Sequence, residues 1–262
     1  MLYIATVCFS QKNPICNCIE YKLTDFDNRT PLLEFKEAFS GSQLHEISNG
    51  IFWDTVLVER YLKQTNYNSL SEFYNLNLSA DNYYQDSPEI GYAKEEDTAL
   101  INSIYIQFLK ENNELIEDRL RFIWSLKSND KYDNEELYFT LYIVKEEQEK
   151  DELLTNKNIE TVRISSNDYN KGEFVAVSFE EEGSELWRKM TKKNIGKFIS
   201  IISENKALST PIINGVITGG ETMITWNFTK EENENLFGLL YCDRIVQRIG
   251  QKKFDKELKK CK

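Results

Sequence analysis

The chain has 262 residues, of which 40% are hydrophobic and 13% aromatic, so it is long and apolar enough to bury the cores of one or two domains. Its formal net charge of −11 argues against nucleic acid as the main partner, because phosphate binding requires a basic surface. No window reaches the ~18 apolar residues that a membrane-spanning helix needs. We therefore expect neither a nucleic-acid partner nor a transmembrane segment.

Residues 1–10 (MLYIATVCFS) are apolar and precede the polar residues Gln11, Lys12 and Asn13. They lack the basic start of a secretory signal. One interpretation is a truncated signal peptide with cleavage near Ser10–Gln11, and the other is an ordinary first strand. The residues alone leave both interpretations open.

Over residues 20–125 the apolar spacing predicts mainly helices. The segments with this spacing are Pro31–Phe39, Ile51–Leu62, Leu70–Leu78 and Ala99–Leu126, of which the last has the strongest pattern. A polar, charged linker follows at Ser128–Asn134. We therefore predict a helical domain of unknown role over residues 11–130.

The second half changes to aromatic and β-branched segments, which favour strands. Strands are predicted at Leu137–Val144, Phe174–Phe179, Phe198–Ile202 and Glu221–Phe228, and helices at Gly183–Asn194 and from Lys230 to about Tyr241. Thr229 and Glu232 have the spacing of a capping box at the start of the last helix. We expect an α+β domain over residues 135–243, with a small, mostly antiparallel sheet and flanking helices.

The chain contains five cysteines, and four remain if residues 1–10 are removed, namely Cys16, Cys18, Cys242 and Cys261. Three pairings are then open. A bridge between the two ends of the chain would suit an oxidising compartment, whereas free thiols would suit the cytoplasm. No metal is expected at Cys16 and Cys18, because they lack the usual two-residue spacer and a nearby histidine.

Several short motifs occur together between Phe174 and Leu240, in one order. They are the strand Phe174–Phe179, the turn Asn194–Lys197 after Thr191, the turn Ser209–Pro211, the glycine turn Thr218–Gly220 and the strand Ile224–Phe228. In this order they resemble the head subdomain of the first periplasmic domain of SecD, a bacterial protein-export factor. Departures from the family pattern are Trp226-Asn227, where the family has glycine, and Glu204–Lys206, where it has Asp-Gly.

The resemblance implies a subdomain outside the membrane that has no catalytic residues and contacts the emerging preprotein. The family's motor lies in membrane helices, for which this sequence has no counterpart. We therefore expect a non-enzymatic, cofactor-free binding module in the periplasm or otherwise outside the cytoplasm, with protein or unfolded polypeptide as its partner.

The candidate binding residues come from the same motifs. Trp226 is the foremost, because it stands where the family has glycine, although the default role of such aromatics is packing in the core. The full set is Trp226, Phe228, Trp187, Pro211, Gly219 and Gly220.

Catalytic patterns are weak. His45 is the single histidine, and nothing in the sequence provides it with a nucleophile and an orienting group. The acidic runs Glu180–Glu182 and Glu231–Glu232 are typical of solvated surface. Gly219-Gly220 lacks the spacing of a phosphate-binding loop.

The C-terminal tail, residues 244–262, is basic on an acidic chain. One interpretation is a solvated helix or a frayed end. The other is an anchor for an acidic partner or for peripheral contact with a membrane surface, with Ile245, Ile249 and Leu258 as an apolar stripe.

Three functions therefore stay open. The first is the SecD-head-like binding module, and the second is a structural or envelope-assembly domain unrelated to export. The third is a hydrolase with its site in the helical half. A cytoplasmic location is the alternative to an extracytoplasmic one, and the sequence leaves the ligand and the oligomeric state undetermined.

Overall fold

The computed structural model describes residues 14–19, 32–47, 87–111, 120–129, 138–146, 153–166, 173–225 and 228–261. Unit 1 comprises Met1–Phe35, Glu152–Lys193 and Gly215–Lys262, and unit 2 comprises Lys36–Asp151 and Asn194–Asn214. The segments of the two units thus alternate along the chain. The domain boundaries expected near residues 130 and 243 stay predictions. The expected elements at residues 1–10, 51–62 and 70–78 lie outside the described residues.

Five strands close into a ring in unit 2, in the order β1, β7, β8, β3, β4 and back to β1. The strands are β1 (Glu34–Ala38), β7 (Phe198–Ser203), β8 (Lys206–Ser209), β3 (Leu120–Asn129) and β4 (Tyr138–Lys145). The pairing of Ala38 with Val144 completes the closure. A sixth strand, β2 (Gly91–Lys94), pairs with β4 outside the ring. The sheet is therefore a small barrel with one added strand.

Every strand of this barrel contributes side chains to one buried cluster. Its members are Ala38, Ile123, Tyr142, Val144, Phe198, Ile202 and Ala207. Alternate residues of a strand point to opposite faces, so the Phe198 and Ile202 side chains share one face of β7. Ile199 and Ile201, on the opposite face of β7, are also buried. A strand buried on both faces explains the continuous apolar run in the sequence.

Two expected helices of the N-terminal half are wrong where the structure describes them. Pro31–Phe39 contains strand β1, because pairing with its neighbours in the barrel decides a short apolar run that fits either period. Over Ala99–Leu126, a helix α4 (Glu95–Glu111) is present, but Leu120–Asn129 forms strand β3. With a short helix α1 (Gly41–Ile47), the described part of this half is mixed rather than mainly helical.

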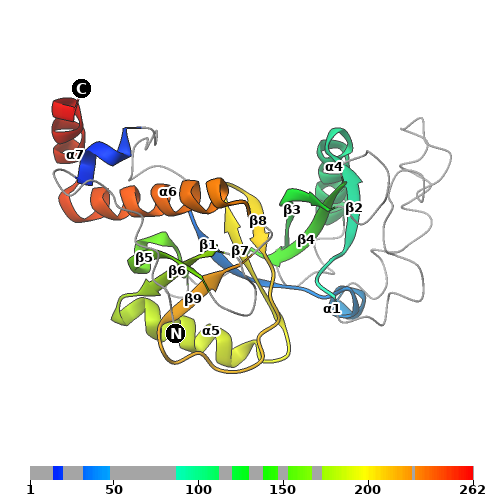
Figure 1. The fold of residues 1–262 in the computed structure, drawn as a ribbon. Helices are drawn as coiled ribbons and strands as arrows, with labels where there is room; N and C mark the ends of the chain where they lie inside the picture. The colour runs from blue at the N-terminus through cyan, green and yellow to red at the C-terminus, as the bar shows by residue number, and fades with distance from the viewer. Residues whose placement is uncertain are drawn as a thin grey trace. The chain divides into compact units, whose positions relative to one another are not determined.

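Unit 1 contains an open antiparallel sheet of three strands in the order β5-β6-β9. The strands are β5 (Ile159–Ser166), β6 (Glu173–Phe179) and β9 (Glu221–Ile224). Helix α5 (Glu181–Lys193) lies along one side of them and helix α6 (Lys230–Ile249) along the other (Figure 1). The central strand is accordingly buried without interruption from Phe174 to Val177.

The α+β class is thus correct, but the single small sheet expected over residues 135–243 is wrong. Strands β4 and β7 belong to the barrel, and β6 and β9 belong to the open sheet. Periodicity identifies individual strands and carries no information on which of two sheets a strand joins.

Three aromatic side chains form the centre of the unit 1 core. The Phe35 ring lies 5.3 Å from the Trp187 ring and 5.5 Å from the Phe179 ring, measured between centroids. The Phe179 and Trp187 rings are 6.1 Å apart. Burial of an aromatic side chain contributes on the order of 1.5–3 kcal/mol, and each favourable pair adds about 0.5–1.5 kcal/mol. This cluster fixes α5 against β6.

Helix α6 begins with the predicted capping box. The Thr229 hydroxyl accepts from the Glu232 amide at 3.2 Å, and the Glu232 carboxylate accepts from the Thr229 amide at 2.6 Å. The helix is longer than expected and ends at Gly250, which has a φ of 80°. A further helix α7 (Gln251–Leu258) and a 3-10 turn η6 (Lys259–Cys261) follow, so the tail is ordered structure rather than a frayed end.

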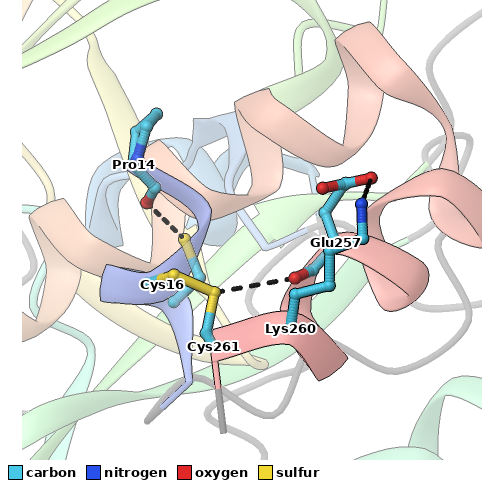
Figure 2. Close-up of a disulfide and its surroundings, with 6 residues drawn as sticks. Pro14, Cys16, Glu257, Lys260 and Cys261 are labelled. Atoms are coloured by element: carbon cyan, nitrogen blue, oxygen red, sulfur yellow. Dashed lines mark hydrogen bonds and ion pairs between the residues drawn. A yellow bond between two sulfur atoms is a disulfide. The ribbon is translucent and has the colours of Figure 1, made fainter. Parts of the chain in front are cut away.

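Two disulfides join the ends of the described chain. Cys16 pairs with Cys261, and Cys18 pairs with Cys242, with Cα atoms 5.3 and 5.7 Å apart. The 3-10 helix η1 (Pro14–Cys18) therefore lies against α6 and α7 (Figure 2). The structure adopts one of the three pairings that the sequence left open.

Candidate functional site

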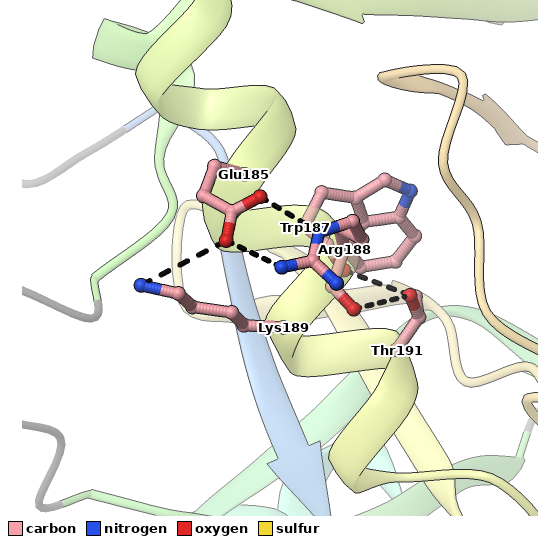
Figure 3. A network of polar contacts seen from close by, with 5 residues as sticks. All are labelled: Glu185, Trp187, Arg188, Lys189 and Thr191. Atoms are coloured by element: carbon pink, nitrogen blue, oxygen red, sulfur yellow. Dashed lines mark hydrogen bonds and ion pairs between the residues drawn. The ribbon is translucent and has the colours of Figure 1, made fainter.

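The residues just before β9 are held by the buried hydroxyl of Thr191 on α5. The Thr191 side chain accepts a hydrogen bond from the Ile217 amide at 3.1 Å and donates within α5 to the Trp187 carbonyl at 2.8 Å. Figure 3 shows Thr191 one turn beyond Trp187 on the same helix. Because Thr191 is fully buried, these bonds fix the backbone just before the glycine turn.

Gly220 fits a space that no other residue could occupy without distortion. Its φ is 63°, and a Cβ atom there would lie 2.2 Å from the Ser184 hydroxyl oxygen. The Gly220 carbonyl accepts from the Phe179 amide at 2.8 Å, which places β9 in register beside β6. Gly219 is exposed, and a side chain there would meet nothing. Gly220 is therefore a structural position, whereas Gly219 lies on the surface.

Strand β9 forms one edge of the open sheet. Hydrogen bonding alternates along an antiparallel pair, and Phe179 and Gly220 are a bonded pair. Glu221 and Met223 are then at non-bonded positions opposite Ser178 and Ala176, so their amides and carbonyls point away from β6. Within the described residues no strand pairs with this outer edge. An extended chain could add here as a further strand.

An exposed apolar side chain belongs to this edge strand. The Met223 side chain is 54% exposed, and Val216, earlier in the sequence before the glycine turn, is 40% exposed. We define Glu221–Met223, with the outer backbone groups of β9, as the β9 edge surface. It offers backbone hydrogen bonds together with an exposed apolar side chain.

A charged pair crosses the adjacent face of the sheet. The Arg163 guanidinium binds the Glu221 carboxylate through two hydrogen bonds of 3.0 Å. The hydrogen bond and the nearby charge lower the pKa of Glu221, and the same hydrogen bond raises the pKa of Arg163. Since both groups are largely exposed, the pair contributes little to stability. It does keep the side chain of Glu221 directed across the sheet.

The opposite edge of the sheet is different, because α6 covers part of it. The Glu160 carbonyl on β5 accepts from Arg244 Nε at 3.3 Å and lies 3.5 Å from a terminal nitrogen of Arg248. These side chains occupy the position of an adding strand at that carbonyl. The two edges therefore differ in accessibility.

Unit 2 has an apolar surface of its own, formed by a short ribbon. Gly196 N donates to Ile213 O and Ile213 N donates to Lys197 O, both at 2.8 Å. Ile195 and Ile212 on this ribbon are 50% and 46% exposed, and Pro211 is exposed as well. These residues belong to two of the motifs that carried the resemblance.

The structure separates the residues that the sequence analysis grouped as candidates for binding. Trp187 is 2% exposed and lies in the core, so it is not available to a partner. Phe228 is partly buried, and Pro211 belongs to unit 2. Trp226 lies outside the described residues. Among the candidates that the structure describes, Gly219 and Gly220 directly precede the β9 edge surface in the sequence.

Sequence reasoning missed the exposed apolar residues Val216, Met223, Ile195 and Ile212. A usable signal existed, because Met223 occupies the face of its short strand that also carries Glu221. Which face of a strand is solvated depends on the helices that cover the sheet, so the pattern alone was ambiguous.

Carboxylates gather at the start of α5 without forming a catalytic arrangement. Glu180, Glu181, Glu182 and Glu185 line an open hollow. Glu185 binds Arg188 at 2.6 and 2.7 Å, and this hydrogen bonding lowers the pKa of the Glu185 carboxyl (Figure 3). Acids in the first turn also favour the helix dipole. Such acidic side chains beside an open hollow are typical of a solvated helix start.

Two further findings concern the described part of the chain. No group of three His, Cys, Asp or Glu side chains there has the arrangement to hold a metal ion. None of its helices combines the length and apolar character required to cross a bilayer. His45 lies in α1.

Comparison with known proteins gives the class of the C-terminal part. Residues 135–242 match the model of the SecDF P1 head subdomain, which confirms for this segment the resemblance seen in its motifs. The match covers less than half of the 262 residues.

Particular relatives are protein translocase subunits SecD. The chain is 46% identical over 80 residues to SecD of Rickettsia conorii, which is 30% of this chain and 15% of that protein. It is 33% identical over 99 residues to SecD of Syntrophobacter fumaroxidans, or 38% of this chain and 16% of the relative. The chain thus matches only about a sixth of the length of these relatives.

Solved SecDF structures are similar at a low level. A super-membrane-facing form of SecDF is 16% identical, covering 81% of this chain and 19% of the other, with a TM-score of 0.36. Another, described as a membrane component that enhances protein export, is 15% identical and covers 80% and 93%, with a TM-score of 0.33.

Proposed function

We propose that this chain is a non-catalytic, extracytoplasmic binding module of the SecD-head type that takes up an extended polypeptide as an added strand on β9. The observation that carries the proposal is the β9 edge surface, where outward backbone groups of Glu221 and Met223 occur together with the exposed Met223 side chain. Backbone hydrogen bonds would give affinity without a strict sequence requirement. Unfolded substrates require such tolerance.

The relatives support a role connected with protein export, because the matched segment is named for the head of a translocase component. A head of this kind acts by contact and not by bond chemistry. A module of this kind has a protein or polypeptide as its partner.

The two disulfides support an extracytoplasmic location. Cys18 and Cys242 are fully buried, and the bridges link residues separated by 224 and 245 positions in the sequence. Disulfides of this structural kind persist in oxidising compartments such as the periplasm.

The decisive experiment measures binding of a fluorescently labelled, unfolded secretory precursor by anisotropy. Met223→Pro removes the outward amide of β9 and leaves the bonds to β6 intact, since proline is tolerated on the solvent side of an edge strand. We expect Met223→Pro to weaken binding at least tenfold. Met223→Ala, which keeps the amide, should weaken it by a smaller factor.

Val162→Pro on the opposite edge is the matched control. By the same alternation the Val162 amide points away from β6, but this edge is partly covered by α6. Binding should be unchanged in this variant. Equal loss of binding in both proline variants, or no binding by the unaltered protein, would contradict strand addition on β9.

Trp226→Gly is a further comparison, because it restores the residue of the family at this position. If Trp226 contributes to the binding surface, the variant should bind the precursor more weakly, with the same unfolding midpoint in urea.

A further inference from the structure

The last turns of the chain present a cluster of lysines. Lys252, Lys253, Lys256, Lys259 and Lys260 are all exposed on α7 and η6. At ~100° per residue, these five positions lie within roughly 120° of one helix face. We call them the lysine face. Sequence spacing alone indicated only that the tail is basic.

The opposite side of the same helix is committed to packing. Phe254 is 1% exposed and lies in a cluster with Cys18, Cys242 and Val246, which Ile249 and Leu258 complete. The apolar stripe that could have entered a membrane is therefore partly buried in the protein itself, which corrects that interpretation of the tail. The helix cannot insert, but its lysine face stays directed to solvent.

The disulfide Cys16–Cys261 fixes the end of this face. It ties η6 to η1 directly after Lys259 and Lys260, as Figure 2 shows for Cys261 beside Lys260 and Glu257. The helix is thus held at both ends, by the Phe254 cluster and by the bridge. A partner meets the lysines in a preformed array, and binding costs less ordering entropy.

Acidic residues within the segment reduce its charge without cancelling it. Between Lys252 and Lys260, five lysines oppose Asp255 and Glu257, which leaves a net charge of +3 on a chain of −11. Lys260 binds Glu257 at 2.6 Å, and this hydrogen bond, followed by the charges of the neighbouring lysines, lowers the pKa of Glu257. Asp255 accepts from Gln251 at 2.8 Å.

We propose that the lysine face binds the surface of an anionic lipid bilayer, through electrostatics and without insertion. The chemistry of the lysine face indicates this partner. Lysine ammonium groups are point charges that suit a diffuse layer of headgroups, whereas arginine is preferred where a single carboxylate is held in a fork. Lysine is also depleted in protein–protein interfaces.

The acidic remainder of the protein makes this contact directional. An anionic surface repels a chain of net charge −11 and attracts a cluster of opposite sign such as the lysine face, so this face favours one orientation of docking. The inference does not depend on strand addition at β9, because it concerns a different element of unit 1.

The test is co-sedimentation of the oxidised, full-length chain with vesicles of phosphatidylglycerol and phosphatidylcholine, compared with vesicles of phosphatidylcholine alone. We expect binding only to the anionic vesicles, with a decrease as salt is raised. The triple variant Lys252→Gln, Lys253→Gln and Lys256→Gln should bind about 100-fold more weakly, from about 1 kcal/mol per lysine.

The matched control is the triple variant Lys189→Gln, Lys192→Gln and Lys193→Gln, which removes the same charge from exposed positions of α5. Both triple variants change the net charge of the chain by the same amount. The α5 variant should nevertheless bind anionic vesicles about as well as the unaltered chain. Equal loss in the two triple variants, or equal binding to both vesicle types, would overturn the proposal. So would competition by soluble polyglutamate at the same charge concentration, because it would assign the face to an acidic polypeptide. Precursor binding at β9 should survive in the Lys252 triple variant, which separates the two proposals.

Discussion

The two units solve the problem of sheet edges in different ways. The barrel of unit 2 closes its ring by pairing β1 with β4, so each of its five strands has a neighbour on both sides. The sheet of unit 1 stays open, with α6 over part of the β5 edge and β9 at the other edge. The barrel contributes a side chain from every strand to one core, whereas unit 1 adds two disulfides to its core.

The difference shows what an open edge requires. A three-stranded sheet buries less apolar surface than a closed ring, and small cores commonly depend on covalent cross-links. In unit 1 the cross-links hold η1, α6 and α7, so that β9 does not need to be covered for stability. Within the described residues the outer edge of β9 is then unpaired and available for a partner, whereas each barrel strand already pairs on both sides, and β4 also pairs with β2.

The largest expected effect comes from the two cores. Trp187→Ala in unit 1 should cost about 3–5 kcal/mol of unfolding free energy, and Ile202→Ala in the barrel about 2–5 kcal/mol. Hydrogen exchange followed by segment should show loss of protection confined to the unit that carries the substitution. Equal loss in both units after either change would contradict the division into two units.

Next in size is the removal of a disulfide. Cys242→Ser should lower the unfolding free energy by about 2–5 kcal/mol, measured by urea denaturation, because it removes the Cys18–Cys242 bridge and disturbs the buried cluster with Val246 and Phe254. Cys261→Ser should cost less, because Cys261 is only partly buried and, in either variant, the bridge that is left still closes the long loop. A barrel substitution such as Ile202→Ala should not change the difference between the two cysteine variants.

A smaller effect is expected at the glycine turn. Gly220→Ala should destabilise unit 1 by about 1–3 kcal/mol, because the new Cβ meets the Ser184 hydroxyl and φ lies in the left-handed region. Measured against Ser184→Gly alone, the additional cost of Gly220→Ala should be smaller, since the clash is absent from that background and only the backbone strain is left. Gly219→Ala, at an open position, is the matched control and should have little effect.

The smallest expected effects are on the pH dependence of stability, which has opposite signs for one residue in each unit. Burial, followed by the charge of Glu89, raises the pKa of Tyr142 in the barrel well above its ordinary value. Its stabilising contribution is therefore complete below about pH 10 and declines as the pH rises further. Tyr142→Phe should make stability less sensitive to alkaline pH, as measured by urea midpoints below and above that value.

The pH dependence of the contribution from Glu221 in unit 1 has the opposite sign. Its lowered pKa means that its contribution is present above about pH 4.3 and is lost as the pH falls through the folded value. Because the pair with Arg163 is exposed, Glu221→Gln should shift the acid midpoint only slightly. A large acid shift would show that this surface pair is more important than its exposure allows.

Local sequence signals were reliable where one short-range rule decided the structure. The Thr229–Glu232 capping box, the strand Phe174–Phe179 and the helix after Glu180 all appear where they were predicted. The class of the C-terminal part followed from motifs whose order is set by the family. In each case neighbouring residues supply the physical constraint.

The same sequence reasoning was wrong where contacts between distant segments decided the structure. Phe35 lies in a strand although its neighbourhood also fits a helix, because β1 is stabilised by its partners in the sheet. Trp187 was grouped with surface candidates, whereas contact with Phe35 and Phe179 places it in the core. Exposure of Met223 depends on which side of the sheet the helices cover.

By itself, the sequence determined four strands and two helices of the second half, the capping box at the start of α6, the resemblance of that half to a SecD head, and the excess of lysine in the tail. Only the tertiary structure decided which strands close into a barrel, which cysteines pair, that β9 is an edge, and that the tail's apolar side is used for packing. The physical reason is that periodicity and capping are interactions between residues a few positions apart. Sheet order, edges and covalent cross-links join segments up to 245 positions apart, and their outcome depends on the whole fold.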